Sequence, residues 1–166
     1  MSIAKITIIC LGKFKEKAYF ELEKEYLKRL SPFAKVKIVE LAEEPYRKNA
    51  DIERIKEKEA DQIRQFLTQN QKNPLNKGAI VILLEEKGTV RNSVEFAGNY
   101  DRLSSLGQEL VFILGSGVGL HDSLKELANY SISLSPLTFP HNLARILLLE
   151  QLYRACTIIS GKEYHK

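Results

Sequence analysis

Apolar residues along the chain alternate between short continuous runs and longer stretches in which they recur at helical spacing. The continuous runs predict strands at residues 3–11, 35–41, 79–84, 110–114 and 130–134. The longer stretches predict helices at residues 15–30, 51–68, 93–106 and 141–159. Strands that alternate with helices are typical of a parallel sheet with helices on both faces. No repeat or change of composition marks a second domain, so the sequence predicts a single α/β domain over residues 1–166.

Helix starts and the loops after the strands add detail to this prediction. Asn92 with Glu95, and Ser123 with Glu126, have the spacing of capping boxes at helix N-termini. Ligands of parallel sheets bind at the carboxyl ends of the strands. We therefore expect one site built from three loops, at residues 85–89, 115–120 and 135–141.

Composition narrows the class of protein. With 44% hydrophobic and 28% charged residues, the chain has the composition of an ordinary soluble globular protein. The net charge of +4 and the isoelectric point of about 9.0 suit a polyanionic partner such as nucleic acid. The basic residues gather in three groups, either as a contact for such a partner or as ordinary solvated positions: Lys13, Lys15 and Lys17; Lys28, Arg29, Lys35 and Lys37; Arg47 and Lys48.

The cysteines and the apolar stretches indicate a cytoplasmic protein. Cys10 and Cys156 lie inside apolar stretches without metal-site spacing, which predicts buried, reduced thiols. Residues 3–11 are too short for a signal peptide, and residues 143–159 contain three charged side chains, so neither predicts membrane insertion. His141 has no partner ligand at a suitable spacing, so we expect no metal site.

Gly115, Gly117 and Gly119 form a glycine loop (residues 115–119) between a predicted strand and a predicted helix. A dinucleotide-binding fingerprint would need a third glycine where Leu120 stands, and no Lys-Ser/Thr pair follows as in a phosphate-binding P-loop. Two interpretations remain. The loop is either a plain turn or a backbone that a small ligand can approach closely.

Residues 134–141, here called the proline segment, are too apolar for an ordinary surface loop, and Pro136 and Pro140 prevent regular structure. This segment predicts either a pocket for a flat base such as adenine or a loop tucked over the core. At the other end of the last helix, Glu150 and Arg154 have the spacing of an ion pair. Residues 164–166, the tail segment, combine an aromatic ring, an imidazole and a cation, which suits unpaired RNA bases and phosphates, although a frayed end is the alternative.

The chain resembles the RlmH-type (YbeA-like) ribosomal RNA large-subunit methyltransferases of the SPOUT superfamily over nearly its whole length. The residues that carry the resemblance are Lys5-Ile6-Thr7-Ile8, Gly12-Lys13, Glu25-Tyr26-Leu27-Lys28-Arg29-Leu30, Lys58-Glu59-Ala60-Asp61, Thr138-Phe139-Pro140-His141, Leu143, Arg145, Leu148, Glu150-Gln151-Leu152-Tyr153-Arg154-Ala155 and Tyr164-His165-Lys166. Three features depart from the family's pattern: Ser116 in place of a second consecutive glycine, Glu163 in place of a proline, and a small insertion at residues 72–77.

This resemblance implies a parallel-sheet SPOUT (α/β knot) fold with a C-terminal trefoil knot, and a homodimer. It implies methyl transfer from S-adenosylmethionine to N3 of a pseudouridine in 23S large-subunit ribosomal RNA, within the ribosome. The donor-binding residues implied by position are Leu84, Gly115, Leu134, Ser135, Pro136, Leu137, Thr138 and Phe139. The RNA-binding residues implied by the tail segment are Tyr164, His165 and Lys166.

Two residues are candidates for the chemistry of transfer. The acceptor imide must lose its N3 proton, and His165 has a suitable intrinsic pKa for a general base. Arg154 is expected to stabilise negative charge that develops on the oxygens of the base. We expect the apolar face of residues 143–159 to contribute to the dimer interface, so that the tail of one subunit completes the site of the other. The residues themselves leave three alternatives open: a SPOUT enzyme for another RNA such as tRNA, a non-catalytic RNA- or ribosome-binding protein, and a nicotinamide-dependent reductase.

Overall fold

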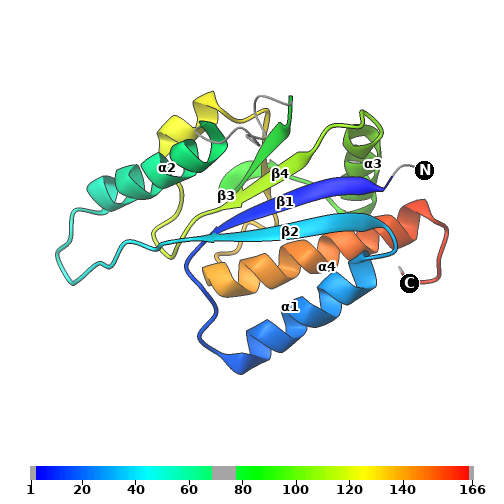
Figure 1. Cartoon of the computed structure of the whole chain (residues 1–166), viewed down its shortest axis with the longest axis horizontal. Helices are drawn as coiled ribbons and strands as arrows, with labels where there is room; N and C mark the ends of the chain where they lie inside the picture. Colours follow the sequence, from blue (N-terminus) through cyan, green and yellow to red (C-terminus); the bar gives the residue numbers. More distant parts are fainter. Residues whose placement is uncertain (1–2, 69–77, 165–166) are drawn as a thin grey trace.

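The computed structural model describes residues 3–68 and 78–164 and forms one parallel sheet surrounded by helices (Figure 1). The elements in chain order are β1 (Ala4–Leu11), α1 (Lys17–Leu30), β2 (Ala34–Leu41), α2 (Ile52–Thr68), β3 (Ile80–Val90), α3 (Ser93–Ser104), β4 (Leu110–Leu114), the 3-10 helix η2 (Asp122–Glu126), β5 (Tyr130–Ser133) and α4 (His141–Ile159). The predicted bounds of β4 and α4 agree with the structure residue for residue.

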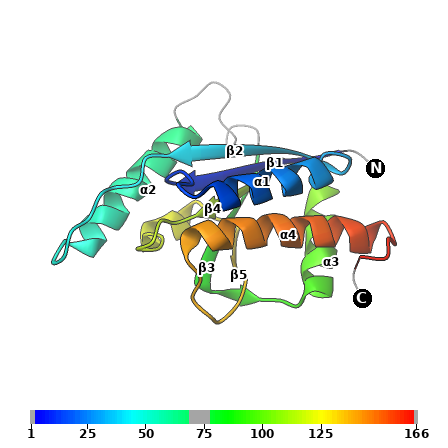
Figure 2. The same ribbon diagram turned by 90° about the horizontal axis from the view of Figure 1, so that it is seen from below.

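The five strands lie in the order β2-β1-β4-β3-β5, and every neighbouring pair is parallel. The predicted parallel sheet is therefore confirmed. Successive residues of β1 alternate between two apolar layers: Ile8 packs with α1, α3 and α4, whereas Ile9 packs with α2 and η2. Helices thus cover both faces of the sheet, and α4 packs against both α1 and α3 (Figure 2).

The position of α4 explains why its sequence is apolar almost all the way round. The sheet, α1 and α3 surround it, and no residue between His141 and Ile159 is fully exposed. Half-buried residues that include Leu143 and Leu147 remain along the helix. None of the helices in the described part of the chain has the length and apolar character needed to cross a membrane.

The structure corrects two predictions, the loop at residues 85–89 and the capping box of Ser123 and Glu126. The predicted loop at residues 85–89 belongs to β3, because a side chain at Gly88 would lie 2.4 Å from the backbone of Ile132, and only glycine allows β3 to return to β5 there. Ser123 and Glu126 do not form a capping box; the His121 ring accepts the Ser123 N–H at 3.3 Å and caps η2 instead.

The capping box of Asn92 and Glu95 is confirmed, with both reciprocal hydrogen bonds at 2.9 Å. Cys10 and Cys156 are free thiols in the core, as predicted. The trefoil knot stays a prediction. The predicted insertion at residues 72–77 lies outside the described residues, as do His165 and Lys166 of the tail segment.

Candidate active site

Three neighbouring strands reach one edge of the sheet together, where β4 and β5 end and β3 bulges before it returns to β5. Leu84 of β3 pairs with Leu114 of β4 on one side and with Ile132 of β5 on the other. The chain segments that follow β4 and β5, which begin at Gly115 and Leu134, therefore leave the sheet on either side of β3. The structure thus brings the ends of the predicted donor-binding segments to a single edge.

The glycine loop folds back on itself. The Gly119 N–H donates to the Ser116 carbonyl at 3.0 Å, and Gly119 has a φ of 84°. A side chain at Gly115 would lie 2.7 Å from the Gly119 carbonyl carbon, so the first glycine is required by close approach and the last by its left-handed backbone. The loop is therefore a defined, tightly closed turn at the end of β4.

Ser116, one of the departures from the family pattern, is hydrogen-bonded to a residue of α2. Its side chain is buried, and its hydroxyl donates to the Glu59 carboxylate of α2 at 2.8 Å. The same Glu59 accepts the Glu44 N–H at 3.1 Å from the loop between β2 and α2. Burial raises the pKa of Glu59, and the carboxylates of Glu43 and Glu44 add to the rise, while its two hydrogen bonds oppose it.

A third segment reaches the glycine loop from the start of α4. A side chain at Gly117 would lie 3.5 Å from the Tyr46 hydroxyl and 3.8 Å from His141 Nδ1. Tyr46, on the loop between β2 and α2, is half exposed.

Within residues 3–68 and 78–164, no three His, Cys, Asp or Glu side chains gather in a way that could hold a metal ion.

The proline segment lies open to solvent in its middle and is anchored at its ends. Leu137 is 70% exposed, whereas Leu134 and Phe139 are half-buried. The Ser133 hydroxyl donates to the Ser135 carbonyl at 2.8 Å, and the Leu137 N–H donates to the Ser135 hydroxyl at 3.0 Å. The exposure of Leu137 shows that the middle of the segment is not tucked over the core.

A cavity of about 370 Å³ adjoins the proline segment. Its walls include Leu134, Phe139 and Leu147, together with the polar side chains of Ser93 and Gln151. A second, shallower pocket of about 370 Å³ includes Gly88 and Ser131 in its lining, and Thr89 lines both pockets. Mixed apolar and polar walls of this kind suit an organic ligand that carries a flat ring and a few polar groups.

Hydrogen bonds connect this cavity to the tail segment. Ser93 donates to Gln151 at 2.9 Å, Gln151 donates to Glu150 at 2.6 Å, and Arg154 donates twice to Glu150, at 3.0 and 2.6 Å. The predicted pair of Glu150 and Arg154 is thereby confirmed. The hydrogen bond with Glu150 is the main cause that raises the pKa of Arg154, which stays cationic at neutral pH. Tyr164 packs beneath the Arg154 guanidinium at 4.9 Å.

The chain does not bring Arg154 to its own glycine loop. His141 lies beside that loop, and Arg154 follows thirteen residues later on the same helix. At 1.5 Å per residue, this separation is about 20 Å along the axis of α4. The glycine loop and Arg154 therefore lie near different ends of α4 within one chain.

The buried glutamates of α1 and α2 were not predicted from the sequence. Glu59 is one of the residues that carry the family resemblance. It lies four residues from both Ile55 and Ile63, in the middle of the apolar stripe of α2. A carboxylate in an apolar stripe is the signal that could have identified it. Glu23 occupies the equivalent kind of position in α1, and it is also buried.

The chain is similar to known methyltransferases along nearly its whole length. The model of the family described as predicted SPOUT methyltransferase matches residues 4–165. Two similar proteins, both named ribosomal RNA large subunit methyltransferase H, come from Desulforamulus reducens (44% identical, covering 98% of this chain and 99% of that protein) and Caldicellulosiruptor saccharolyticus (42% identical, covering 97% and 99%). A third of the same name, from Bacillus pumilus, is 39% identical and covers 97% of this chain and 99% of that protein.

Solved structures share the fold at much lower identity. A probable methylase family protein from Haemophilus influenzae matches with a TM-score of 0.57 and 13% identity, over 98% of this chain and 71% of that chain. The SpoU methyltransferase AviRb from Streptomyces viridochromogenes, solved in complex with AdoMet, matches with a TM-score of 0.52 and 9% identity, over 98% and 61%. These similarities concern the fold.

Proposed function

The chain belongs to the SPOUT methyltransferase family, and from this premise we propose that it methylates N3 of a pseudouridine in the 23S RNA of the large ribosomal subunit, with S-adenosylmethionine as the methyl donor. The names of the relatives support ribosomal RNA as the substrate. Their similarity extends over nearly the full length of both chains, so the proposal concerns the whole protein rather than a shared fragment. The bound AdoMet of AviRb, a protein of similar fold, supports the donor.

One observation carries the proposal. The glycine loop and the proline segment, whose Leu137 is exposed, leave the same edge of the sheet on either side of β3. We assign donor binding to Leu84, Gly115 and the proline-segment residues Leu134, Ser135, Pro136, Leu137, Thr138 and Phe139. Apolar side chains together with a loop backbone that a ligand can approach closely match an adenine ring with its polar edge. The exposed Leu137 would become buried when the donor binds.

The bound donor supplies an electrophilic methyl group on its sulfonium, so the protein needs no covalent intermediate. The work of the chain is then to align the acceptor nitrogen with that methyl group and to exclude water from the site. The glycine loop and the proline segment, which leave the sheet on either side of β3, would hold the donor. Tyr46, beside Gly117, extends this surface toward the loop between β2 and α2.

The acceptor nitrogen has to lose its proton, and we assign this step to His165 as general base. Arg154 stabilises the negative charge that develops on the oxygens of the base. Its pair with Glu150 orients the guanidinium for this role. Tyr164 and Lys166, with His165, contact the RNA by stacking and by phosphate binding.

We also propose that these residues act across a homodimer. Because Arg154 lies about 20 Å along α4 from the glycine loop of its own subunit, the tail segment of one subunit serves the donor site of the other. Half-buried apolar residues of α4, such as Leu143 and Leu147, offer the surface for this contact. Sedimentation at micromolar concentration should show a dimer, and a monomer would contradict the arrangement.

The proposed function is tested by mass spectrometry of nucleosides from ribosomes of cells that lack the protein. Loss of one methylated pseudouridine from 23S RNA supports it, and an unchanged profile contradicts it. Loss of a modification from tRNA instead would assign the enzyme to that RNA. Salt-sensitive RNA binding without methyl transfer would indicate a binding protein, and binding of NAD(H) rather than S-adenosylmethionine would indicate a reductase.

The roles of the two catalytic candidates are tested separately. His165→Ala and Arg154→Ala should each lower the rate of single-turnover methylation by about 100-fold or more with saturating RNA, as expected for loss of a proton acceptor or of charge stabilisation. Near wild-type rates in both variants would contradict these roles while leaving the proposed substrate intact.

A further inference from the structure

Glu59 is a buried carboxylate that joins two loops at the edge where the strands end. Its side chain is 3% exposed and lies within the apolar layer between α2 and the sheet. Oε2 accepts the hydroxyl of Ser116 at 2.8 Å, and Oε1 accepts the backbone N–H of Glu44 at 3.1 Å. One carboxylate therefore holds both the glycine loop and the loop between β2 and α2.

The bond to Ser116 reaches the loop that closes the end of β4. The Ser116 hydroxyl also accepts the Val118 N–H at 3.4 Å, and the Ser116 carbonyl accepts the Gly119 N–H at 3.0 Å. Ser116 thus forms hydrogen bonds both within the glycine loop and to α2. Without the carboxylate, its buried hydroxyl would lose its acceptor.

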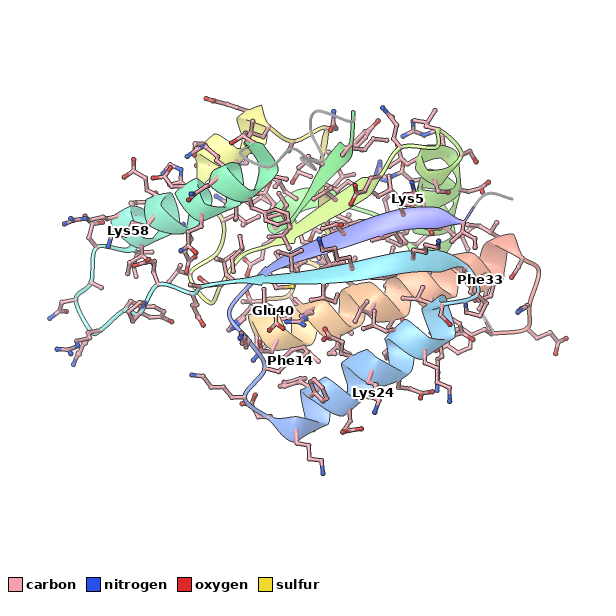
Figure 3. The ribbon with its side chains drawn as sticks, viewed as in Figure 1. Lys5, Phe14, Lys24, Phe33, Glu40 and Lys58 are labelled. Atoms are coloured by element: carbon pink, nitrogen blue, oxygen red, sulfur yellow. The ribbon has the colours of Figure 1, made fainter. Side chains whose placement is uncertain are left out.

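No cation offsets the charge of Glu59 in the part of the chain that the structure describes. Lys58, which projects from α2 in Figure 3, forms its ion pair with Glu44 at 3.5 Å rather than with Glu59. Glu43 and Glu44 face the same carboxylate and raise its pKa further. A buried charge held only by two hydrogen bonds is unfavourable for folding, which indicates that it serves the site it fastens.

We propose that Glu59 is a positioning residue for the methyl donor, which acts through Ser116 to hold the glycine loop in the shape that receives it. This inference rests on the proposed function of the same site. Ser116 stands where we expected a second glycine. Its hydroxyl provides the hydrogen bond by which Glu59 of α2 holds the loop in shape. Glu59 itself contacts neither the donor nor the reacting atoms.

The test measures S-adenosylmethionine binding to the full chain by calorimetry in four variants: Glu59→Gln, Ser116→Ala, the double variant, and Glu57→Gln as the matched control. Glu57 carries the same charge on the same helix but is exposed. We expect the dissociation constant to rise about 10-fold or more in Glu59→Gln, the scale of a hydrogen bond to a charged group. Ser116→Ala should give a rise of the same kind, and Glu57→Gln should bind as the unaltered chain does.

The double variant separates positioning from general loss of structure. Because Glu59 acts on the glycine loop through its hydrogen bond with Ser116, the double variant should bind the donor no more weakly than the weaker-binding single variant. Losses that multiply would overturn the inference. Saturating donor should also restore the single-turnover methylation rate of Glu59→Gln, since a positioning role on the donor loop changes donor affinity more than the chemical step. A rate that stays low at saturating donor would overturn it as well.

Two further outcomes distinguish this inference from the proposed function. If the unaltered chain and all variants bind the donor equally, the role of Glu59 is wrong and the proposed function stands. If the unaltered chain does not bind the donor, both are wrong. Urea unfolding of each variant identifies any that do not fold, and Ser116→Ala, the smaller change, decides the question if Glu59→Gln is one of them.

Discussion

Two buried glutamates lie on opposite faces of the sheet and have opposite electrostatic surroundings. Glu23 of α1 receives two hydrogen bonds from the Arg145 guanidinium of α4, at 2.5 and 2.7 Å. Arg145 also lies 3.5 Å from Glu40 and 4.1 Å above the Phe14 ring. Glu59, by contrast, has two hydrogen-bond donors and two neighbouring carboxylates.

This difference separates a charge that supports the fold from one that serves the site. Burial is the largest single effect on the pKa of Arg145 and lowers it, but the hydrogen bond to Glu23 and the neighbouring negative charges, which include Glu23 and Glu40, together outweigh burial and keep the guanidinium ionised. The pair joins α1 to α4, two helices that contact each other on the same face. Glu59 joins loops rather than helices. We therefore expect changes at the ion pair to affect stability and changes near Glu59 to affect the ligand.

The largest expected effect is on stability, from Arg145→Met. This substitution leaves the buried Glu23 without its countercharge, which should lower the free energy of unfolding by about 3–5 kcal/mol. Urea or thermal unfolding measures the loss. The control is the double substitution Glu23→Met with Arg145→Met, which removes both buried charges and should recover most of the stability. If Arg145→Met were as stable as the unaltered chain, the ion pair with Glu23 would not support the fold, and the contrast with Glu59 would be wrong.

The next effect concerns the ligand side of the comparison. Gly115→Ala adds a methyl group 2.7 Å from the backbone of Gly119, so the glycine loop must open. We expect the dissociation constant for S-adenosylmethionine to rise about 10-fold or more, while the unfolding free energy falls by less than in Arg145→Met, within the 1–3 kcal/mol typical of overpacking.

Gly98→Ala is the matched control for this substitution. Gly98 lies within α3, is exposed, and has no atom within 4 Å of an added side chain. Alanine there should raise the unfolding free energy by about 0.5–1 kcal/mol and leave donor binding unchanged. Equal donor affinity in both variants would show that the glycine loop does not shape the donor site.

The features of the fold that depend on local sequence pattern were predicted from the sequence. Continuous apolar runs identified the five strands, and helical spacing gave the bounds of α4 without error. The edge of the sheet at which the predicted donor-binding segments meet followed from the rule for parallel sheets. These features are predictable because each is encoded within a few consecutive residues.

The buried charges could not be predicted in the same way, because their partners are distant in sequence. Glu23 and Arg145 are separated by 122 positions, and Glu59 and Ser116 by 57. A glutamate on a helix is ordinarily solvated, so only contacts between elements distinguish these two from their exposed neighbours. The return of β3 to β5 depends likewise on the close approach of Gly88 to the backbone of Ile132. The spacing of apolar residues in the sequence does not predict this contact.

The smallest expected effect is a difference in how stability depends on pH. Because burial raises the pKa of Glu59 above 4.5 in the folded chain, the folded state binds that proton more tightly than the unfolded state does. The contribution of Glu59 to stability is therefore largest at low pH and falls as the pH rises from its ordinary value through the raised one. Glu59→Gln has no such proton to lose.

Urea unfolding of the unaltered chain and of Glu59→Gln, across about pH 4 to 8, isolates this contribution. Exposed carboxylates such as Glu25, whose pKa the hydrogen bond from Arg29 lowers, have the opposite slope but are common to both proteins and cancel in the difference. The unaltered chain should lose stability relative to the variant as the pH rises, whereas a difference that is constant with pH would contradict the raised pKa. Since the ionised carboxylate is also the better acceptor for Ser116 and Glu44, the same rise in pH that weakens the fold should strengthen the hold on the glycine loop.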